Sequence, residues 1–248
     1  MSVWAVLAAA GRGERLGSDR PKAFARLGGR PLLAESLERL EASAWIDWIV
    51  IAAPPEWEEP CILVAEEIGA GKVSSVVTGG AARSESVRLA LEEVPEEAAV
   101  VLVHDAARPL LPDEVIERVL APLSEGWDGA VPALPVADTV KRVEQDQVVE
   151  TLTRAELVAA QTPQAFVAPA LRDALGGDLS AASDCSSLVE ARGGRIKIVD
   201  GDRRLLKVTD AEDLALVSTW LGVAPALPIP EDEFDDEDDD DGDGDEEA

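Results

Sequence analysis

The chain has 248 residues, with 50 Asp and Glu, 22 Lys and Arg, and a formal net charge of −28. This acidic composition argues against a nucleic-acid-binding protein, because duplex binding depends on clustered Lys and Arg that neutralise phosphates. The absence of an apolar run of about 20 residues argues against a membrane helix. Two cysteines that are far apart, Cys61 and Cys185, favour the reducing cytoplasm. With a single histidine, they also argue against a metal site built on Cys or His.

Apolar runs alternate with helical patterns through the first part of the chain. Strand patterns lie at 3–10, 46–53, 72–78, 100–104 and 130–134. Helical patterns lie at 31–43, 56–68, 84–93 and 112–123. This alternation predicts an α/β fold with a doubly wound, mostly parallel sheet, in which ligands bind at the carboxyl ends of the strands.

The alternation is interrupted by a segment at 137–153, which is predicted to form a β-hairpin. Apolar and polar residues alternate on both sides of Gln145 and Asp146. An isolated hairpin is only marginally stable in water, so it should pack either on its own sheet or on another subunit. Helices are expected beyond it at 169–175, 184–191 and 210–221, with a strand at 195–199. Thr209 is the expected N-cap of the last helix, with Glu212 at position N3.

An acidic tail is predicted to follow a single domain that covers residues 1–222. Residues 231–247 contain fourteen Asp and Glu and no cation. We expect 223–248 to be disordered, because the tail has few apolar side chains whose burial could offset the entropy of ordering it. Its expected role is solubility or the recruitment of a basic partner.

The first strand leads into a glycine loop that is suited to a polyphosphate. Gly11 and Gly13 permit a sharp turn close to a ligand, and the backbone N–H groups of such a turn favour an anion. Arg15 and Lys22 can then stabilise charge at a reacting phosphorus. The chain lacks a P-loop pattern, and Gly17 comes one position too late for a dinucleotide-binding loop. A tight turn without a ligand is the structural alternative.

Several further motifs accompany this loop. They are Gly79-Gly80 with Arg83 and Ser86, V-H-D-A-A-R-P at 103–109, D-T-V-K at 138–141, T-P-Q at 162–164, and Lys207-Val208-Thr209. Together with the loop, they resemble the 2-C-methyl-D-erythritol 4-phosphate cytidylyltransferase family over residues 3 to about 221. The resemblance implies a Rossmann-like nucleotidyltransferase fold and the transfer of CMP from CTP to methylerythritol 4-phosphate, in non-mevalonate isoprenoid biosynthesis.

Two alternatives remain from the sequence. The ribitol-5-phosphate cytidylyltransferases share most of these motifs and the same chemistry. A protein of another class, a catalytically silent nucleotide-binding scaffold, is the second alternative, although every cation of the implied site is present in the chain.

The resemblance also implies a role for each candidate residue. The catalytic candidates are Arg15, Lys22 and Lys207, which would neutralise the reacting phosphates. Asp105 is the expected Mg²⁺ ligand, since nucleotide chemistry uses a metal held by one or two carboxylates and by phosphate oxygens. The expected CTP-binding residues are Ala9, Ala10, Gly11, Gly13, Gly79, Gly80, Ser86 and Ala106. The expected contacts to the alditol phosphate are Arg108, Thr139, Arg154, Thr162 and Ser183.

The hairpin is implied to be an arm that embraces the second subunit of a homodimer, so that Thr139 and Arg154 act across the interface. His104 is expected to point away from Asp105 and to pack, because neighbouring side chains of a strand alternate in direction. Arg83 is expected to position its loop.

Overall fold

The computed structural model describes residues 2–11, 13, 16, 20–179 and 182–223. Arg15 therefore lies outside the described residues. So does the predicted acidic tail, apart from its first residue, Val223.

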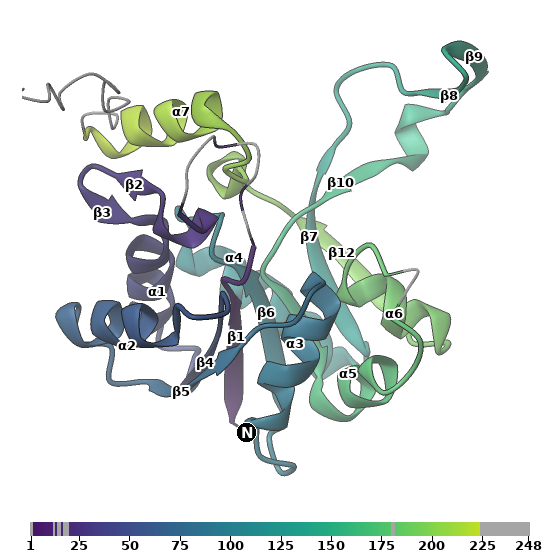
Figure 1. Cartoon of the computed structure of the whole chain (residues 1–248). Coiled ribbons are helices and arrows are strands. Elements are labelled where there is room, and N and C mark those ends of the chain that lie inside the picture. Colours follow the sequence, from purple (N-terminus) through teal and green to yellow (C-terminus); the bar gives the residue numbers. More distant parts are fainter. Residues whose placement is uncertain (1, 12, 14–15, 17–19, 180–181, 224–248) are drawn as a thin grey trace, which may run out of the picture.

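A mostly parallel sheet forms the middle layer of the molecule (Figure 1). Its strands are β1 (Val3–Ala8), β4 (Trp48–Ala53), β5 (Val73–Thr78), β6 (Val100–Asp105), β7 (Gly129–Pro135), β10 (Val158–Ala160), β11 (Gln164–Val167) and β12 (Ile196–Asp200). The strand order is β10-β7-β11-β6-β1-β4-β5, and β12 also pairs with β7. β1, β4, β5 and β6 are parallel, whereas β11 runs antiparallel between β6 and β7. The predicted α/β fold with a mostly parallel sheet is confirmed.

Helices cover both faces of this sheet, which is the doubly wound arrangement. They are α1 (Leu32–Ala42), α2 (Glu58–Glu67), α3 (Arg83–Glu92), α4 (Asp113–Leu120), α5 (Ala168–Leu175) and α6 (Cys185–Ala191), whereas α7 (Ala211–Leu221) lies outside these two layers. Leu7 and Leu102 pack on the face covered by α1, α2 and α4. Val6 and Val103, one residue away in each strand, pack on the face covered by α3, α5 and α6. Continuous apolar strands therefore bury both of their faces.

Further short elements lie outside the main sheet. They are the strands β2 (Arg26–Leu27) and β3 (Arg30–Pro31) and the 3₁₀ turns η2 (Lys22–Phe24), η3 (Ala121–Glu125), η4 (Arg154–Glu156) and η5 (Arg203–Leu205). Helix α7 packs over β2 through a small cluster that includes Val217 and Leu27. None of the helices in the described part of the chain is long and apolar enough to cross a membrane.

The start of α7 differs from the predicted one. The N-cap is Asp210, whose carboxylate accepts a hydrogen bond from the Asp213 backbone N–H. Thr209 instead donates its backbone N–H to the Asp213 carboxylate from outside the helix. The prediction of Thr209 as N-cap was wrong because Asp210 places a stronger, charged acceptor at the helix N-terminus.

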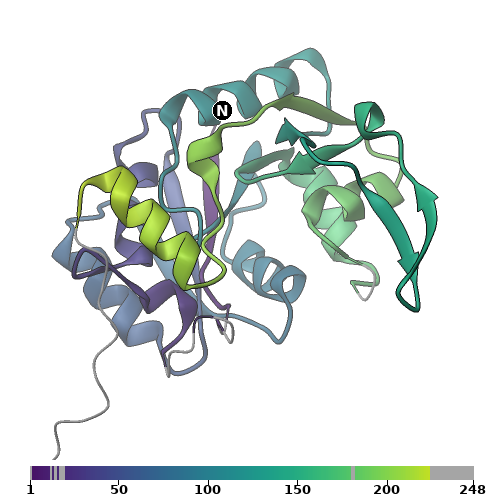
Figure 2. The same ribbon diagram turned by 90° about the horizontal axis from the view of Figure 1, so that it is seen from above.

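The predicted hairpin is present as β8 (Lys141–Glu144) and β9 (Gln147–Thr151). Gln145 and Asp146 both have positive φ, 45° and 67°, which matches the type I′ turn that favours hairpins. The hairpin forms a sheet of its own, and every residue of β8 and β9 is exposed. Figures 1 and 2 both show it projecting from the body on the side opposite to α7. We call residues 137–153 the arm.

Both cysteines are buried free thiols. Burial raises the pKa of Cys61 to about 12 and also raises the pKa of Cys185. Because the thiolate is the reactive species, we expect neither thiol of the folded protein to react rapidly with Ellman's reagent at about pH 8. Both should react once the protein is denatured. A rapidly reacting thiol in the folded protein would contradict this burial.

Candidate active site

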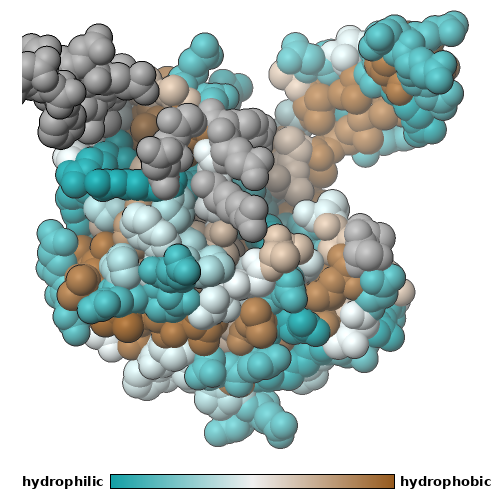
Figure 3. Space-filling view, in the orientation of Figure 1, coloured by the Kyte–Doolittle hydropathy of each residue, from teal (hydrophilic) through white to brown (hydrophobic). Residues whose placement is uncertain are grey.

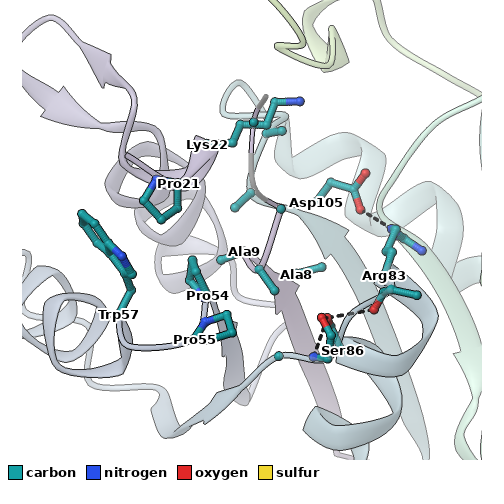
Figure 4. Close-up of a pocket in the computed structure, with 18 of the residues that line it drawn as sticks. Ala8, Ala9, Pro21, Lys22, Pro54, Pro55, Trp57, Arg83, Ser86 and Asp105 are labelled. Carbon is teal, nitrogen blue, oxygen red and sulfur yellow. Dashed lines mark hydrogen bonds and ion pairs between the residues drawn. The ribbon is translucent and has the colours of Figure 1, made fainter. Parts of the chain in front are cut away.

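A cavity of about 900 Å³ lies at the carboxyl ends of β1, β4, β5 and β6 (Figure 4). This is the edge at which a doubly wound sheet is expected to bind its ligand. Pro54, Pro55 and Trp57 line one side of the cavity, and Arg83 and Asp105 line the other. The cavity thus combines an apolar wall with a charged one.

The glycine loop closes against the segment that carries Lys22. The Lys22 backbone N–H donates to the Gly11 carbonyl at 3.2 Å. Gly13 has a φ of 74°, and a Cβ at this position would lie 2.8 Å from the Lys22 Cβ. A side chain at position 13 would therefore be strained and would also push the lysine away. The two glycines allow Lys22 to line the same cavity as the loop.

A second glycine segment lies directly against the first. A Cβ on Gly79 would lie 2.3 Å from the Ala10 Cβ, and the Gly79 N–H donates to the Ala53 carbonyl at 2.8 Å. The Ser86 hydroxyl accepts a hydrogen bond from the Gly80 N–H at 3.1 Å and so holds the next residue in place. The two segments predicted to bind CTP are therefore in contact, and small residues make that contact possible.

Asp105 is paired with two cations on the charged side of the cavity. Arg83 Nε lies 2.7 Å from Oδ1, and Lys207 Nζ lies 2.8 Å from Oδ2. Burial alone would raise the pKa of Asp105, but the charges of Arg83 and Lys207 outweigh it and hold the pKa well below its usual range. The carboxylate is therefore ionised at neutral pH, inside a cluster that carries a net positive charge.

Two guanidinium N–H groups near this carboxylate are buried without a hydrogen-bond partner in the described part of the chain. They are Nη2 of Arg83 and Nε of Arg108. The Nη1 group of Arg108 donates to the Leu205 carbonyl, which fixes the side chain beside the residues that precede Lys207. Unpaired buried donors are costly, so both groups would be stabilised by an acceptor such as a bound anion.

His104 is fully buried and lies behind Asp105. Its Nδ1 is 3.2 Å from the Thr162 hydroxyl, and its Nε2 is 3.1 Å from the Arg108 carbonyl. Burial lowers the pKa of His104 to about 4. The imidazole is therefore neutral at neutral pH, in agreement with the expectation that it packs and does not act as a base in the cavity.

Most of the predicted site residues line the one cavity. They are Ala9, Ala10, Gly11, Gly13, Lys22, Gly79, Gly80, Ser86, Asp105, Ala106 and Lys207. Thr162 is buried behind Asp105 and does not line the cavity. Ser183 is exposed just before α6, with its hydroxyl 3.4 Å from that of Ser187.

Thr139 and Arg154 are exposed at the base of the arm and do not line this chain's cavity. Arg154 Nη1 donates to the Ala137 carbonyl at 2.7 Å, which places its guanidinium on the arm. In this conformation both residues lie away from the cavity of their own chain.

The sequence matches one protein family over most of its length. The family described as 2-C-methyl-D-erythritol 4-phosphate cytidylyltransferase matches residues 3–222. The chain belongs to this family. The cytidylyltransferase of that name from Frankia casuarinae is 44% identical over 220 residues, which cover 88% of this chain and 81% of the relative. The one from Nocardia farcinica is 43% identical over 227 residues, which cover 91% and 96%.

A solved structure of the family agrees with the fold. The crystal structure of 2-C-methyl-D-erythritol 4-phosphate cytidylyltransferase from Thermus thermophilus is 33% identical and superposes with a TM-score of 0.70. The match covers 88% of this chain and 98% of that chain. The resemblance drawn from the motifs is confirmed.

The places of two residues at this site were not evident from the sequence. Arg83 was expected to position a loop, whereas it is ion-paired with Asp105. Trp57 was not predicted to line the cavity; it packs on Phe24 with ring centroids 4.5 Å apart. Its place depends on Glu56, which adopts a φ of 67° in a turn closed by the Trp57 N–H and the Pro54 carbonyl. Glycine is the usual residue at such a position, and its absence hid the turn.

Proposed function

We propose that the chain transfers CMP from CTP to 2-C-methyl-D-erythritol 4-phosphate and releases pyrophosphate. Membership of the cytidylyltransferase family supports this reaction. The observation that supports this reaction in this chain is the cavity, which is lined by Lys22, Asp105 and Lys207 together with the two glycine segments. A cavity of about 900 Å³ has room for a nucleoside triphosphate beside a second phosphate.

The attacking group is the phosphate of the alditol. A phosphate monoester has its second pKa near 6, so it is already a nucleophile at neutral pH. The protein therefore needs no nucleophile of its own, which fits the buried state of both cysteines and of His104. In-line attack on the α-phosphorus of CTP forms the new P–O bond while the bond to pyrophosphate breaks.

The main task of the protein is to bring two polyanions together and to neutralise their repulsion. We assign Lys22, with Arg15 from the same loop, to the triphosphate. Lys207 is assigned to the α-phosphate, where it would exchange part of its contact with Asp105 for the reacting oxygens. The unpaired N–H groups of Arg83 and Arg108 supply further donors, and Arg108 suits the phosphate of the alditol because a guanidinium can donate two parallel hydrogen bonds.

Mg²⁺ is the proposed cofactor, and Asp105 is its proposed ligand. Among the described residues no group of three or more His, Cys, Asp or Glu could hold a metal by itself. Mg²⁺ with a nucleotide commonly needs only one or two carboxylates in addition to phosphate oxygens, and Asp105 supplies an ionised one. Each of its oxygens accepts one hydrogen bond and retains a lone pair. When bound, the ion would add positive charge beside the phosphates.

A homodimer formed through the arm is also proposed. Figure 3 shows a hydrophobic band along the arm. Val143, Val148 and Val149 of the arm, and Val158 of the following strand β10, are exposed by 47–53%. Isolated hairpins are marginal in water, so a second copy that covers these valines would stabilise the arm. It would also deliver Thr139 and Arg154 to the partner's cavity.

The cellular location and the tail also remain proposals. Two free, buried cysteines support a cytoplasmic protein.

Truncation after Ile229 is expected to leave the melting temperature and kcat nearly unchanged, with at most a small salt-dependent shift in KM. The reason is that charges in solution are screened over about 8 Å at physiological salt. Thermal melts and steady-state assays check this expectation, and a large loss of activity at moderate salt would contradict it.

Pyrophosphate release tests the reaction directly. The full chain is mixed with Mg²⁺ and CTP, and either methylerythritol 4-phosphate or ribitol 5-phosphate is added. We expect release with methylerythritol 4-phosphate at a much higher kcat/KM. A preference for ribitol 5-phosphate would instead support the alternative activity, that of a ribitol-5-phosphate cytidylyltransferase. No release, with the protein folded and both ligands bound, would support a catalytically silent scaffold.

A further inference from the structure

A buried chain of hydrogen bonds connects the T-P-Q segment with the loop that carries Asp105 and Arg108. The Asp105 N–H donates to the Thr162 hydroxyl at 3.1 Å. That hydroxyl lies 3.2 Å from His104 Nδ1, and His104 Nε2 lies 3.1 Å from the Arg108 carbonyl. His104 is 0% exposed and Thr162 is 4% exposed, so water does not compete for these bonds.

The direction of each bond follows from the groups involved. The Arg108 carbonyl can only accept, so Nε2 of His104 carries the hydrogen and donates it. A neutral imidazole has one donor and one acceptor, so Nδ1 accepts the hydrogen of the Thr162 hydroxyl. The oxygen of this hydroxyl then accepts from the Asp105 N–H. Each of these donors is matched to one acceptor, with no freedom to reverse the order.

This chain of bonds holds both ends of one tight turn. The Arg108 N–H donates to the Asp105 carbonyl at 2.9 Å, which closes the turn over Ala106 and Ala107. Thr162 holds its first residue and His104 holds its last. Asp105, at the first end, is paired with Arg83 and Lys207 in the cavity. Arg108, at the other end, carries the unpaired Nε group.

We propose that His104 and Thr162 are positioning residues, which fix the Asp105 carboxylate and the Arg108 guanidinium through these hydrogen bonds. Thr162 acts through His104 and the Asp105 backbone, in place of the direct contact with the alditol phosphate that its motif implied. This inference deepens the proposed function and rests on it, since catalysis is one of its readouts. Errors of about 1 Å in the placement of reacting groups can cost two orders of magnitude in rate.

Two substitutions of His104 separate the two bonds of the imidazole. His104→Gln can place an amide N–H near the position of Nε2 and keep the bond to the Arg108 carbonyl, while it loses the Nδ1 acceptor. His104→Asn can place its amide oxygen near the position of Nδ1 and keep the bond to Thr162, while it loses the bond to the Arg108 carbonyl.

We expect His104→Gln to lower kcat by about tenfold, because the Thr162 hydroxyl loses its acceptor on the imidazole, which disconnects His104 from Asp105 and leaves a buried donor unpaired. We expect His104→Asn to raise KM for the alditol phosphate by about tenfold, because Arg108 is released while kcat changes little. A merely structural role for His104 would lower the melting temperature without this division between kcat and KM, and equal effects on both constants in both variants would overturn the proposal.

Thr162 provides a matched pair of nearly isosteric substitutions. Thr162→Ser keeps the hydroxyl and should retain activity within about twofold, whereas Thr162→Val removes it and should lower kcat by about tenfold. A double-mutant cycle then decides how Thr162 acts. If it acts through His104, adding His104→Gln to Thr162→Val should cost little more, since the same link is already broken. If the loss of kcat in the double variant equals the product of the two single losses, Thr162 makes an independent contact with the substrate, and the proposal is overturned.

A measurement on the protein without substrate tests the hydrogen bonds independently of catalysis. The chain contains a single histidine, so a long-range ¹⁵N–¹H spectrum shows one imidazole. We expect the hydrogen on Nε2 in the wild type and in Thr162→Ser, with slow exchange of the Asp105 amide hydrogen. The exchange should become faster in Thr162→Val. A hydrogen on Nδ1, or equal exchange in both Thr162 variants, would overturn the proposal. An inactive wild type that shows this tautomer and this exchange would instead count against the proposed reaction.

Discussion

Lys22→Ala is expected to lower kcat by roughly 10²–10³, the cost typical of losing one donor that stabilises a reacting oxyanion. Lys22 lines the cavity beside Gly11 and Gly13, where the triphosphate is proposed to bind. Its ammonium group would be worth more in the transition state, because negative charge accumulates around the five-coordinate phosphorus. The fold should be almost unaffected, since the backbone bond from Lys22 to Gly11 does not depend on the side chain.

Lys197→Ala provides the matched control. This lysine is exposed on β12, lies over the Trp127 ring at 5.0 Å and does not line the cavity. Both variants lose one positive charge, so a general electrostatic effect would slow them equally. Steady-state kinetics at saturating CTP and alditol phosphate, together with thermal melts, measure the difference. A Lys22→Ala enzyme within a few-fold of the wild type would refute the assignment.

The fold could be predicted well because its main elements follow local patterns. Apolar runs that bury both faces marked β1, β4 and β6, and the motifs at their carboxyl ends had to meet at one edge of the sheet. Gly11 and Asp105 lie in the same cavity for this reason. The hairpin was also visible, since its alternation and its two turn residues are local features.

What could not be predicted depends on partners that are distant in the sequence. Strand β11 pairs antiparallel with β6, and this pairing brings Thr162 against Asp105 and His104. Nothing in the T-P-Q motif itself indicates that its threonine faces a histidine 58 residues earlier. The ion pair of Arg83 with Asp105 likewise depends on the way α3 is seated on the sheet.

The same limit applies to residues of the arm. The motifs implied that Arg154 belongs to a site, and the structure places it at the base of the arm, away from the cavity of its own chain. Both observations are compatible if the site is shared between subunits. This arrangement can be tested because it requires two chains for each complete site.

We therefore expect a mixture of Lys22→Ala chains and Arg154→Ala chains to regain activity after the subunits are exchanged. In a two-fold symmetric heterodimer, one site would combine both substitutions, and the other would contain an intact Lys22 and an intact Arg154. Random reassembly would make about half of the dimers mixed, each with one working site, so about a quarter of the wild-type activity should return. Neither variant alone should approach this level.

A mixture of Lys22→Ala and Lys207→Ala chains is the matched control. Both lysines line the cavity of one chain, so every site in their heterodimer retains one defect and no activity should return. Differently tagged chains allow the heterodimers to be purified and their formation to be verified. If purified Lys22→Ala/Arg154→Ala heterodimers remain as inactive as the parents, Arg154 acts within its own chain or not at all. Recovery in the first mixture alone would place Arg154 in the partner's site, since a general effect of mixing would also restore the control.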